Sequence, residues 1–278
     1  MLTTWHRLLA WCTFLLFAAC LHGQDAADIV RRAIALQEHS LDLSRGYSYQ
    51  QRQELREADS SGKLKKTESD TYEMLMVEGS HYRHHVAHND KPLPPAEKAK
   101  EDEKLRRVTE ERRKETPEER KRRIEESERR RRKQREPYRQ VPEAFNLRVA
   151  GEETVNGIEA WVIEATPKPG YRPVSNATRF FPRMKGRIWI ARQDYETLKV
   201  DIESLDTISF GGFLIRMAKG SHVVIDAVRV NGEVWMPKTV VLRGSVRIAL
   251  IKVVRGEYVF TFSDYKKAQA APGAVMGQ

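Results

Sequence analysis

Four histidines, His81, His84, His85 and His88, form the one cluster of metal-binding side-chain types in the sequence. The stretch that holds them reads as a strand, on which His81 and His85 would share a face about 13 Å apart. That separation is too large for two ligands of one ion, and His84 and His88 face the same difficulty on the other side of the strand. No carboxylate or cysteine converges on them at ligand spacing. The cluster therefore predicts neither a metal site nor a bound cofactor.

Motifs that position a nucleophile or a phosphate are also missing. The sequence has no G-x-S-x-G elbow, and Gly211-Gly212 lacks the lysine and the following helix of a phosphate-binding loop. Its two cysteines, Cys12 and Cys20, both lie near the N-terminus, which excludes thiol catalysis and cysteine-bound zinc elsewhere. These features predict a binding protein and not an enzyme. A pair of carboxylates brought together only by folding keeps a hydrolase open as an alternative.

A charged insertion is predicted over residues 92–137. Between Ala96 and Glu136 it has 18 Lys or Arg against 13 Asp or Glu, and so supplies about half of the net charge of +10. Opposite charges recur at helical spacing, which predicts a helix interrupted near Thr116–Pro117. A simple solvated helix is one interpretation of this segment. The other is contact with an anionic membrane surface or an envelope protein, with these candidate residues: Arg129, Arg130, Arg131, Arg132 and Lys133.

The first 23 residues have the layout of a secretory signal peptide. His6 and Arg7 precede an apolar run too short for a comfortable transmembrane helix, and small residues follow it. Cleavage after Gly23 would release a soluble periplasmic protein that begins at Gln24. Because such a protein is exported, nucleic acid is not an expected partner.

A second interpretation of the N-terminus is lipidation. The residues Phe17-Ala18-Ala19-Cys20 resemble a bacterial lipobox, in which the cysteine is diacylated and becomes the first residue. Cys20 would then anchor the protein to a membrane. Phe17 stands where leucine is usual, so we expect the soluble form.

The rest of the chain alternates apolar and polar residues as antiparallel strands do. Leu198, Val200 and Ile202 fall on one face of a strand, with charged residues between them. Asn231–Gly232 between two valine-rich runs predicts a tight hairpin, because both central residues of such a turn need positive φ. Two further glycines, Gly244 and Gly256, are interpreted as turn positions.

One amphipathic helix is predicted over residues 25–44, where Asp25 or Asp28 can cap the first N–H groups. Further strands are predicted before the charged insertion and after it. We expect an α+β fold in which residues 24–267 form a single domain, followed by a disordered tail, residues 268–278.

Three groups of motifs resemble the outer-membrane lipoprotein carrier superfamily, which includes LolA-like, LolB-like and RseB-like periplasmic proteins. They are Val155–Trp161 leading into Ala165, then Gly186–Ala191 with Tyr195–Asp201, and Val230–Pro237. The resemblance covers about residues 145–263, and more weakly 25–90. It implies a strongly curved antiparallel sheet, an open half-barrel, whose concave face is covered by helices.

The resemblance also implies a hydrophobic cavity for lipid or for the acyl chains of a lipoprotein, in cell-envelope maintenance or lipoprotein sorting. The candidate cavity residues are Trp161, Trp189, Phe210, Phe213 and Trp235. Ile188 and Ile190 point away from Trp189, so only one of the two sets can face the cavity, and the sequence leaves open which. The alternative function is an envelope-stress sensor or interaction module that binds a peptide in the same groove.

Mass spectrometry of the mature protein tests the predicted processing. We expect the N-terminal peptide to begin at Gln24 without modification, because the apolar core ends just before Gly23. The Cys20→Ser variant should give the same mature mass. A diacylated Cys20 in the natural chain, lost in that variant, would contradict the soluble form.

Overall fold

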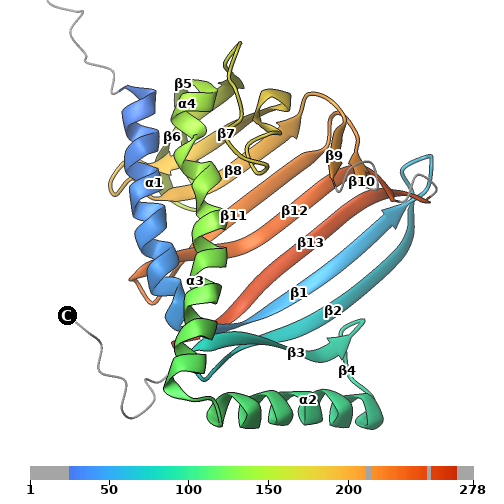
Figure 1. Ribbon diagram of the computed structural model, residues 1–278. Coiled ribbons are helices and arrows are strands. Elements are labelled where there is room, and N and C mark those ends of the chain that lie inside the picture. Colours follow the sequence, from blue (N-terminus) through green and yellow to red (C-terminus); the bar gives the residue numbers. More distant parts are fainter. Residues whose placement is uncertain (1–24, 211–214, 249–251, 268–278) are drawn as a thin grey trace, which may run out of the picture.

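One antiparallel sheet organises the molecule. The computed structural model describes residues 25–210, 215–248 and 252–267 (Figure 1). The sheet is 13-stranded, in the order β4-β3-β2-β1-β13-β12-β11-β8-β7-β6-β5; in addition, β10 pairs with β12, and β9 pairs with β10. In the described part of the chain, its two end strands, β4 and β5, do not pair with each other, so the sheet stays open. The predicted α+β class and open antiparallel sheet are therefore confirmed.

One helix precedes the first four strands, three helices follow in succession, and the remaining strands complete the described chain. The helices are α1 (Ala26–Leu43), α2 (Pro95–Arg113), α3 (Pro117–Arg139) and α4 (Val141–Ala144), with 3-10 turns at Ser44–Gly46 and Phe181–Arg183. The strands are β1 (Tyr47–Ala58), β2 (Leu64–Val77), β3 (Ser80–His88), β4 (Lys91–Pro92), β5 (Phe145–Val155), β6 (Ile158–Pro167), β7 (Met184–Ala191), β8 (Thr197–Ser204), β9 (Ile208–Phe210), β10 (Ile215–Met217), β11 (His222–Val230), β12 (Val234–Ile248) and β13 (Lys252–Lys267). The predicted signal peptide, Cys20, Phe213 and the predicted tail lie outside the described residues.

Helix α1 packs against strands from β5 to β12, and its contact with β6 and β7 holds the best-buried core. The Asp25 carboxylate accepts a hydrogen bond from the backbone N–H of Ala27 at 3.1 Å, as predicted for the cap. The apolar stripe of α1 then lies against β6 and β7, where Ile163 and Ile190 are fully buried. The helix predicted over residues 25–44 is confirmed.

The strand register continues this apolar surface far beyond α1. Residues directly opposite each other in antiparallel strands point to the same face. One apolar side chain from each of seven neighbouring strands therefore lies in a single row on the side that carries α1: Val149, Ile163, Ile188, Val200, Ile225, Val240 and Phe260. A second row runs beside it and includes Ile202, Val223 and Leu242. We call this side of the sheet the apolar face.

The opposite face is polar along the neighbouring row. Arg148, Glu164 and Arg187 stand side by side on β5, β6 and β7, and Glu164 forms ion pairs with both arginines at 2.5 and 3.4 Å. Solvated charge pairs across strands are stable without a covering layer. Further along, the same row continues through Asp201 to Val224, Val241 and Val259, which are half-buried. The two faces therefore differ most on β5, β6 and β7, and the apolar face carries the longer unbroken apolar row.

Two glycines that the sequence suggested as turns lie inside strands instead. Gly244 in β12 and Gly256 in β13 pair directly with each other, with φ of 151° and 139°. A Cβ at Gly256 would overlap the carbonyl oxygen of Arg56 in β1, and one at Gly244 would overlap the Ser221 side chain. The prediction of turns here was wrong, because a glycine within a strand can also mark a close approach of backbones.

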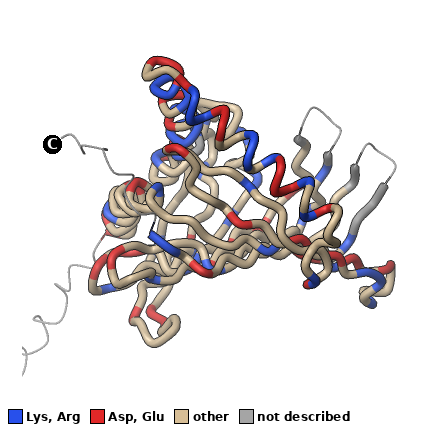
Figure 2. Tube along the Cα trace, turned by 90° about the horizontal axis from the view of Figure 1, so that it is seen from below, with Lys and Arg blue, Asp and Glu red and all other residues tan. Residues whose placement is uncertain are grey.

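The charged insertion forms two helices that meet at an elbow, residues 114–116. Thr116 caps α3 in a reciprocal capping box with Glu119, and Pro117 occupies the first turn, where no backbone N–H is needed. The helix therefore breaks where the sequence predicted. Lys and Arg are interspersed with Asp and Glu along the two helices, apart from the run of cations at residues 129–133 (Figure 2).

The core contact of α1 predicts a strong asymmetry between two truncations. Ile163→Ala should lower the free energy of unfolding by about 2–5 kcal/mol, because Ile163 is 0% exposed beneath α1. Leu64→Ala, at a side chain that is 59% exposed, should change it by less than about 0.5 kcal/mol. Urea denaturation measures both. Equal losses would show that the α1 contact is not the core of the fold.

Candidate ligand-binding face and arginine cluster

The apolar face is only partly covered in its middle. Ile163 and Ile190 are buried beneath α1, but Ile225, Val240 and Phe260, further along the sheet, are half-buried. Half-buried aliphatic and aromatic side chains in a continuous row can gain free energy by covering an apolar ligand. This row is therefore the candidate ligand-binding surface.

Aromatic rings extend the apolar face toward α3. Phe262 follows Phe260 on the same side of β13, and its ring centroid lies 6.0 Å from that of Tyr49 in β1. The Tyr49 ring also contacts Tyr265 at 5.4 Å and the His81 imidazole at 6.0 Å. Burial raises the pKa of the hydroxyls of Tyr49 and Tyr265, so both stay neutral over the physiological range.

His81 connects this aromatic group to α3. A ring nitrogen, Nδ1, lies 3.0 Å from the Arg131 guanidinium, and the other, Nε2, lies 2.8 Å from the backbone carbonyl oxygen of Tyr47. A guanidinium can only donate and a carbonyl can only accept. His81 is therefore neutral, with its proton on Nε2, and it accepts a hydrogen bond from Arg131.

Burial lowers the pKa of the His81 imidazole below its ordinary value of 6.5. The hydrogen bond to Tyr47 opposes this shift, and the positive charge of Arg131 adds to it. Both the geometry and the direction of the pKa shift thus favour the neutral ring at pH 7.

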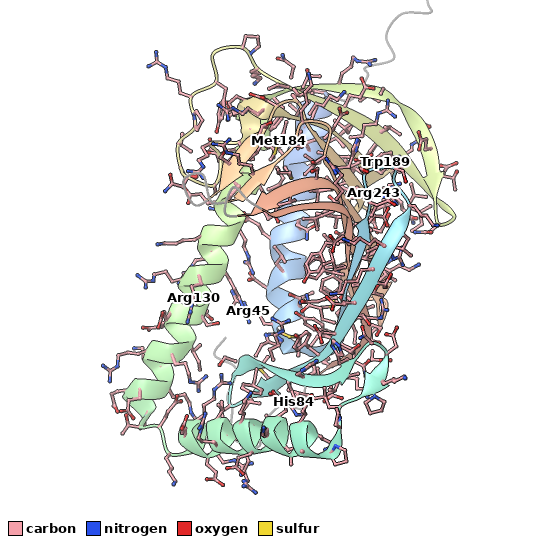
Figure 3. The ribbon with its side chains drawn as sticks, turned by 90° about the vertical axis from the view of Figure 1, so that its right-hand side faces the viewer. Arg45, His84, Arg130, Met184, Trp189 and Arg243 are labelled. Atoms are coloured by element: carbon pink, nitrogen blue, oxygen red, sulfur yellow. The ribbon has the colours of Figure 1, made fainter. Side chains whose placement is uncertain are left out.

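Two further arginines lie near Arg131. Arg45, which follows α1, and Arg135 in α3 each lie 2.8 Å from the same carboxylate oxygen of Asp42. Arg45 also pairs with Glu128 at 3.1 Å, and in Figure 3 it lies between α1 and α3. Burial, together with the charges of Arg45 and Arg135, lowers the pKa of Arg131. We call Arg45, Arg131, Arg135 and His81 the arginine cluster.

The elbow between α2 and α3 is tied to the β2–β3 turn. Arg112 donates to the carbonyl oxygens of Val77 and Ser80 at 2.9 and 3.0 Å, and Arg123 donates to that of Glu78 at 2.8 Å. These charge-assisted bonds satisfy the backbone of a turn that strands alone would leave unpaired. They hold the start of α3 at the edge of the apolar face.

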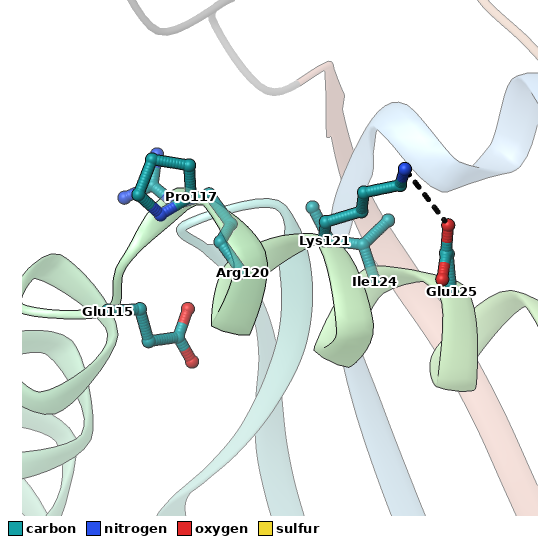
Figure 4. A pocket seen from close by; sticks show the side chains of 6 residues that line it. All are labelled: Glu115, Pro117, Arg120, Lys121, Ile124 and Glu125. Carbon is teal, nitrogen blue, oxygen red and sulfur yellow. Dashed lines mark ion pairs between the residues drawn. The ribbon is translucent and has the colours of Figure 1, made fainter.

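A pocket of about 540 Å³ lies at this elbow (Figure 4). It is lined by Glu115, Pro117, Arg120, Lys121, Ile124 and Glu125. Lys121 and Glu125 form an ion pair at 4.0 Å across one side of it. These lining residues all belong to the elbow and to the first turns of α3, so the pocket is separate from the apolar face.

The aromatic residues proposed from the sequence divide between two clusters. Trp189 is buried on the polar side of the sheet with Val162 and Leu198, Trp235 packs against this cluster, and the Trp189 indole N–H donates to Glu153 at 2.8 Å. Trp161 lies on the other face, against the α1 core. The set is therefore not gathered at one site.

Phe210 ends strand β9, and Phe213 lies outside the described residues. The face that carries Ile188 and Ile190, which the sequence left undecided, is the apolar face. Sequence analysis missed Val240, Phe260 and Tyr49 as candidates because each is an ordinary residue of an alternating strand. Only the register places Val240 and Phe260 in one row, and only the tertiary structure brings the Tyr49 ring against Phe262 beside it.

The proposed anionic-contact residues also divide. Arg131 turns inward to His81, whereas Arg129, Arg132 and Lys133 are exposed. Arg130 is 68% exposed and pairs with Glu126 at 3.4 Å. Four of the five cations thus lie on the solvent side of α3, and one faces the sheet.

The histidines do not keep the simple alternation predicted for them. A bulge at Val86 places His88 on the same side as His85. Both rings lie near the same oxygen of Asp70, His88 Nδ1 at 2.9 Å and His85 Nε2 at 3.0 Å. His84 instead faces Asp102 of α2 at 3.2 Å. Over the described ranges, no group of three or more His, Cys, Asp or Glu side chains is placed to hold a metal ion.

The known structures that resemble this chain are distant from it in sequence. No family model and no curated protein matches the sequence. A structure described as an outer membrane lipoprotein-sorting protein domain, from Vibrio parahaemolyticus, is 13% identical, covering 89% of this chain and 95% of its own, with a TM-score of 0.33. A LolA superfamily protein from Nitrosomonas europaea is 11% identical, with coverages of 89% and 94% and a TM-score of 0.29.

MucB from Pseudomonas aeruginosa, solved in complex with MucA, is 11% identical, covering 88% of this chain and 100% of its own, with a TM-score of 0.24. These neighbours belong to the groups that the sequence motifs resemble. At such TM-scores they carry no argument about a ligand or partner, which must come from the geometry. Among the residues that the structure describes, no helix is long and apolar enough to cross a membrane.

The His81–Arg131 contact predicts that acid loosens α3. The pKa of His81 is lower in the folded chain than its ordinary value of 6.5, which we take for the unfolded chain. The neutral ring therefore stabilises the folded state fully above about pH 6.5, and this contribution is lost as the pH falls through the pKa of the folded chain. Hydrogen exchange of α3 amides should therefore be faster at about pH 5.5 than at about pH 7.5, after correction for the intrinsic rate. His81→Gln, which keeps a donor and an acceptor, should remove this pH dependence. The same pH response in that variant would refute the assignment to His81.

Proposed function

We propose that this protein binds the acyl chain of a lipid or lipoprotein along its apolar face, as an exported binding protein of the bacterial cell envelope. The observation that carries this proposal is the row of apolar side chains that continues past the cover of α1. At its far end the row is formed by Ile225, Val240 and Phe260, all half-buried. The signal peptide expected over residues 1–23 supports export.

Binding of this kind needs no covalent chemistry. Each methylene that leaves water for an apolar surface contributes roughly 0.8 kcal/mol. Helix α3, which is tied to the sheet mainly through arginine side chains, can move without disrupting the core beneath α1, because its buried contacts are few. It is suited to admit a chain and to cover it.

The outer side of α3 would contact an anionic membrane surface. Its exposed cations, Arg129, Arg130, Arg132 and Lys133, lie on the side away from the sheet. Clustered lysines and arginines gain about 1 kcal/mol each near an anionic leaflet. The acidic residues interspersed on the same helix weaken that attraction, so we expect a transient contact.

A peptide-binding role is a second candidate, favoured by the free edge of β5. This strand ends the sheet order, and its residues 150–154 are all exposed. An edge strand offers unpaired N–H and C=O groups to which an extended peptide can add. An envelope-stress sensor could use this edge to hold a polypeptide partner.

Native mass spectrometry of protein purified from the periplasm without detergent separates the two functions. A stoichiometric lipid mass that solvent extraction removes would support acyl-chain binding and identify the chain. A lipid-free mass that stays unchanged after incubation with lipid would refute it. Retention of a polypeptide partner after delipidation would favour the second function.

Val240→Glu is expected to weaken binding of the neutral apolar probe N-phenyl-1-naphthylamine at least about tenfold, because it puts a charge in the half-buried part of the row. Val241→Glu, one residue along on the opposite face, is the matched control and should leave binding unchanged. Fluorescence titration measures both, and circular dichroism checks that each variant is folded. Equal effects of the two substitutions would mean that the apolar face is not the binding surface.

A further inference from the structure

Arg131 is a charged side chain held inside the fold by a neutral partner. Arg131 belongs to α3, and its partly buried side chain faces the sheet, where the guanidinium donates to His81 Nδ1 at 3.0 Å. Within the described part of the chain, no carboxylate forms an ion pair with it. Buried or partly buried cations are usually paired with an anion, because desolvation of an unpaired charge is costly. The site is therefore short of one negative charge.

The neighbouring arginines do not supply that charge. Arg45 and Arg135 share Asp42, and Arg45 also pairs with Glu128, so three arginines face two carboxylates. In addition, Arg45 Nε is buried and has no hydrogen-bond partner among the described residues. The group carries one excess positive charge and at least one free, directed N–H donor.

The location of this group relates it to the proposed acyl-chain surface. Phe260 ends the apolar row, Phe262 follows it on the same strand face, and Tyr49 connects Phe262 to His81 through ring contacts of 6.0 Å. A molecule that lies along the row thus meets Arg131 beyond the aromatic rings. An amphiphile has this order of parts, with an apolar chain that ends in a charged head.

We propose that the arginine cluster is a subsite for the anionic headgroup, phosphate or carboxylate, of an amphiphile whose chain lies along the apolar face. The inference rests on the proposed acyl-chain binding and adds the chemistry of the head. Arg131 and Arg45 would donate to the headgroup oxygens, as guanidinium groups do to phosphate and carboxylate. The ligand would supply the missing negative charge. Its binding would also draw α3 and the end of α1 together over the chain.

Isothermal titration calorimetry with three probes tests this assignment on the full mature chain. The probes are n-dodecyl phosphate, n-dodecyl maltoside with the same chain and a neutral head, and inorganic phosphate with no chain. Both amphiphiles are kept below their critical micelle concentrations. We expect n-dodecyl phosphate to bind roughly tenfold or more tightly than n-dodecyl maltoside, since hydrogen bonds to charged groups are the stronger kind. Inorganic phosphate should bind more weakly than n-dodecyl phosphate.

Arg131→Gln should remove the preference for the phosphate head and leave n-dodecyl maltoside binding unchanged. Arg122→Gln, an exposed arginine of the same helix, is the matched control and should keep the preference. Thermal melting checks that both variants fold as the natural chain does. Should Arg131→Gln fail to fold, Arg45→Gln provides the same comparison, and the preference of the natural chain still decides the question.

Each outcome separates the headgroup subsite from the chain surface. Equal affinity of the natural chain for both amphiphiles, or a preference that survives Arg131→Gln, would overturn the subsite and leave chain binding standing. Binding of inorganic phosphate that depends on Arg131, with no binding of either amphiphile, would overturn chain binding and keep a free-anion site. If none of the three probes binds, both proposals are wrong.

Discussion

The register of the antiparallel strands is the constraint on which the rest of this molecule depends. Directly paired residues share a face, so a single alternation of apolar and polar residues is multiplied across seven strands into one apolar surface. Helix α1 buries that surface above Ile163 and Ile190 and also reaches β12, but it leaves Ile225, Val240 and Phe260 half-buried. The half-buried remainder belongs to an apolar row unbroken across seven strands, whereas charged residues interrupt the row on the opposite face. This difference is the physical reason why we assign the apolar face to ligand binding.

The charged insertion supplies a second layer by a different mechanism. Helices α2 and α3 have almost no apolar stripe with which to pack, so arginines attach them. Arg112 and Arg123 bind backbone carbonyls of the β2–β3 turn, Arg135 binds Asp42, and Arg139 binds Glu38 at the far end of α3. Contacts made by polar side chains at a partly solvated surface are individually modest. Such a helix is held in place yet remains separable from the sheet.

The proposals for the two surfaces therefore share one physical basis. An apolar row needs cover, and the helix that lies over its end carries a guanidinium that needs an anion. An acyl chain with a charged head meets both requirements at once. The free edge of β5, at the other side of the sheet, is independent of this arrangement and would serve a peptide without involving the arginines.

The sequence by itself determined the local structure: the capped helix after Asp25, the strands and hairpins, and the break at Thr116–Pro117. These features depend on periodicity, caps and turn residues, which act over a few neighbouring positions. Only the tertiary structure decided which face is apolar over its whole width, and that Gly256 lies within a strand against Arg56 instead of in a turn. It also decided that Trp161 and Trp189 lie on opposite faces, and that Arg131 alone among the five cations of residues 129–133 turns inward. These outcomes depend on register, bulges and contacts between residues far apart in the chain, which no local pattern specifies.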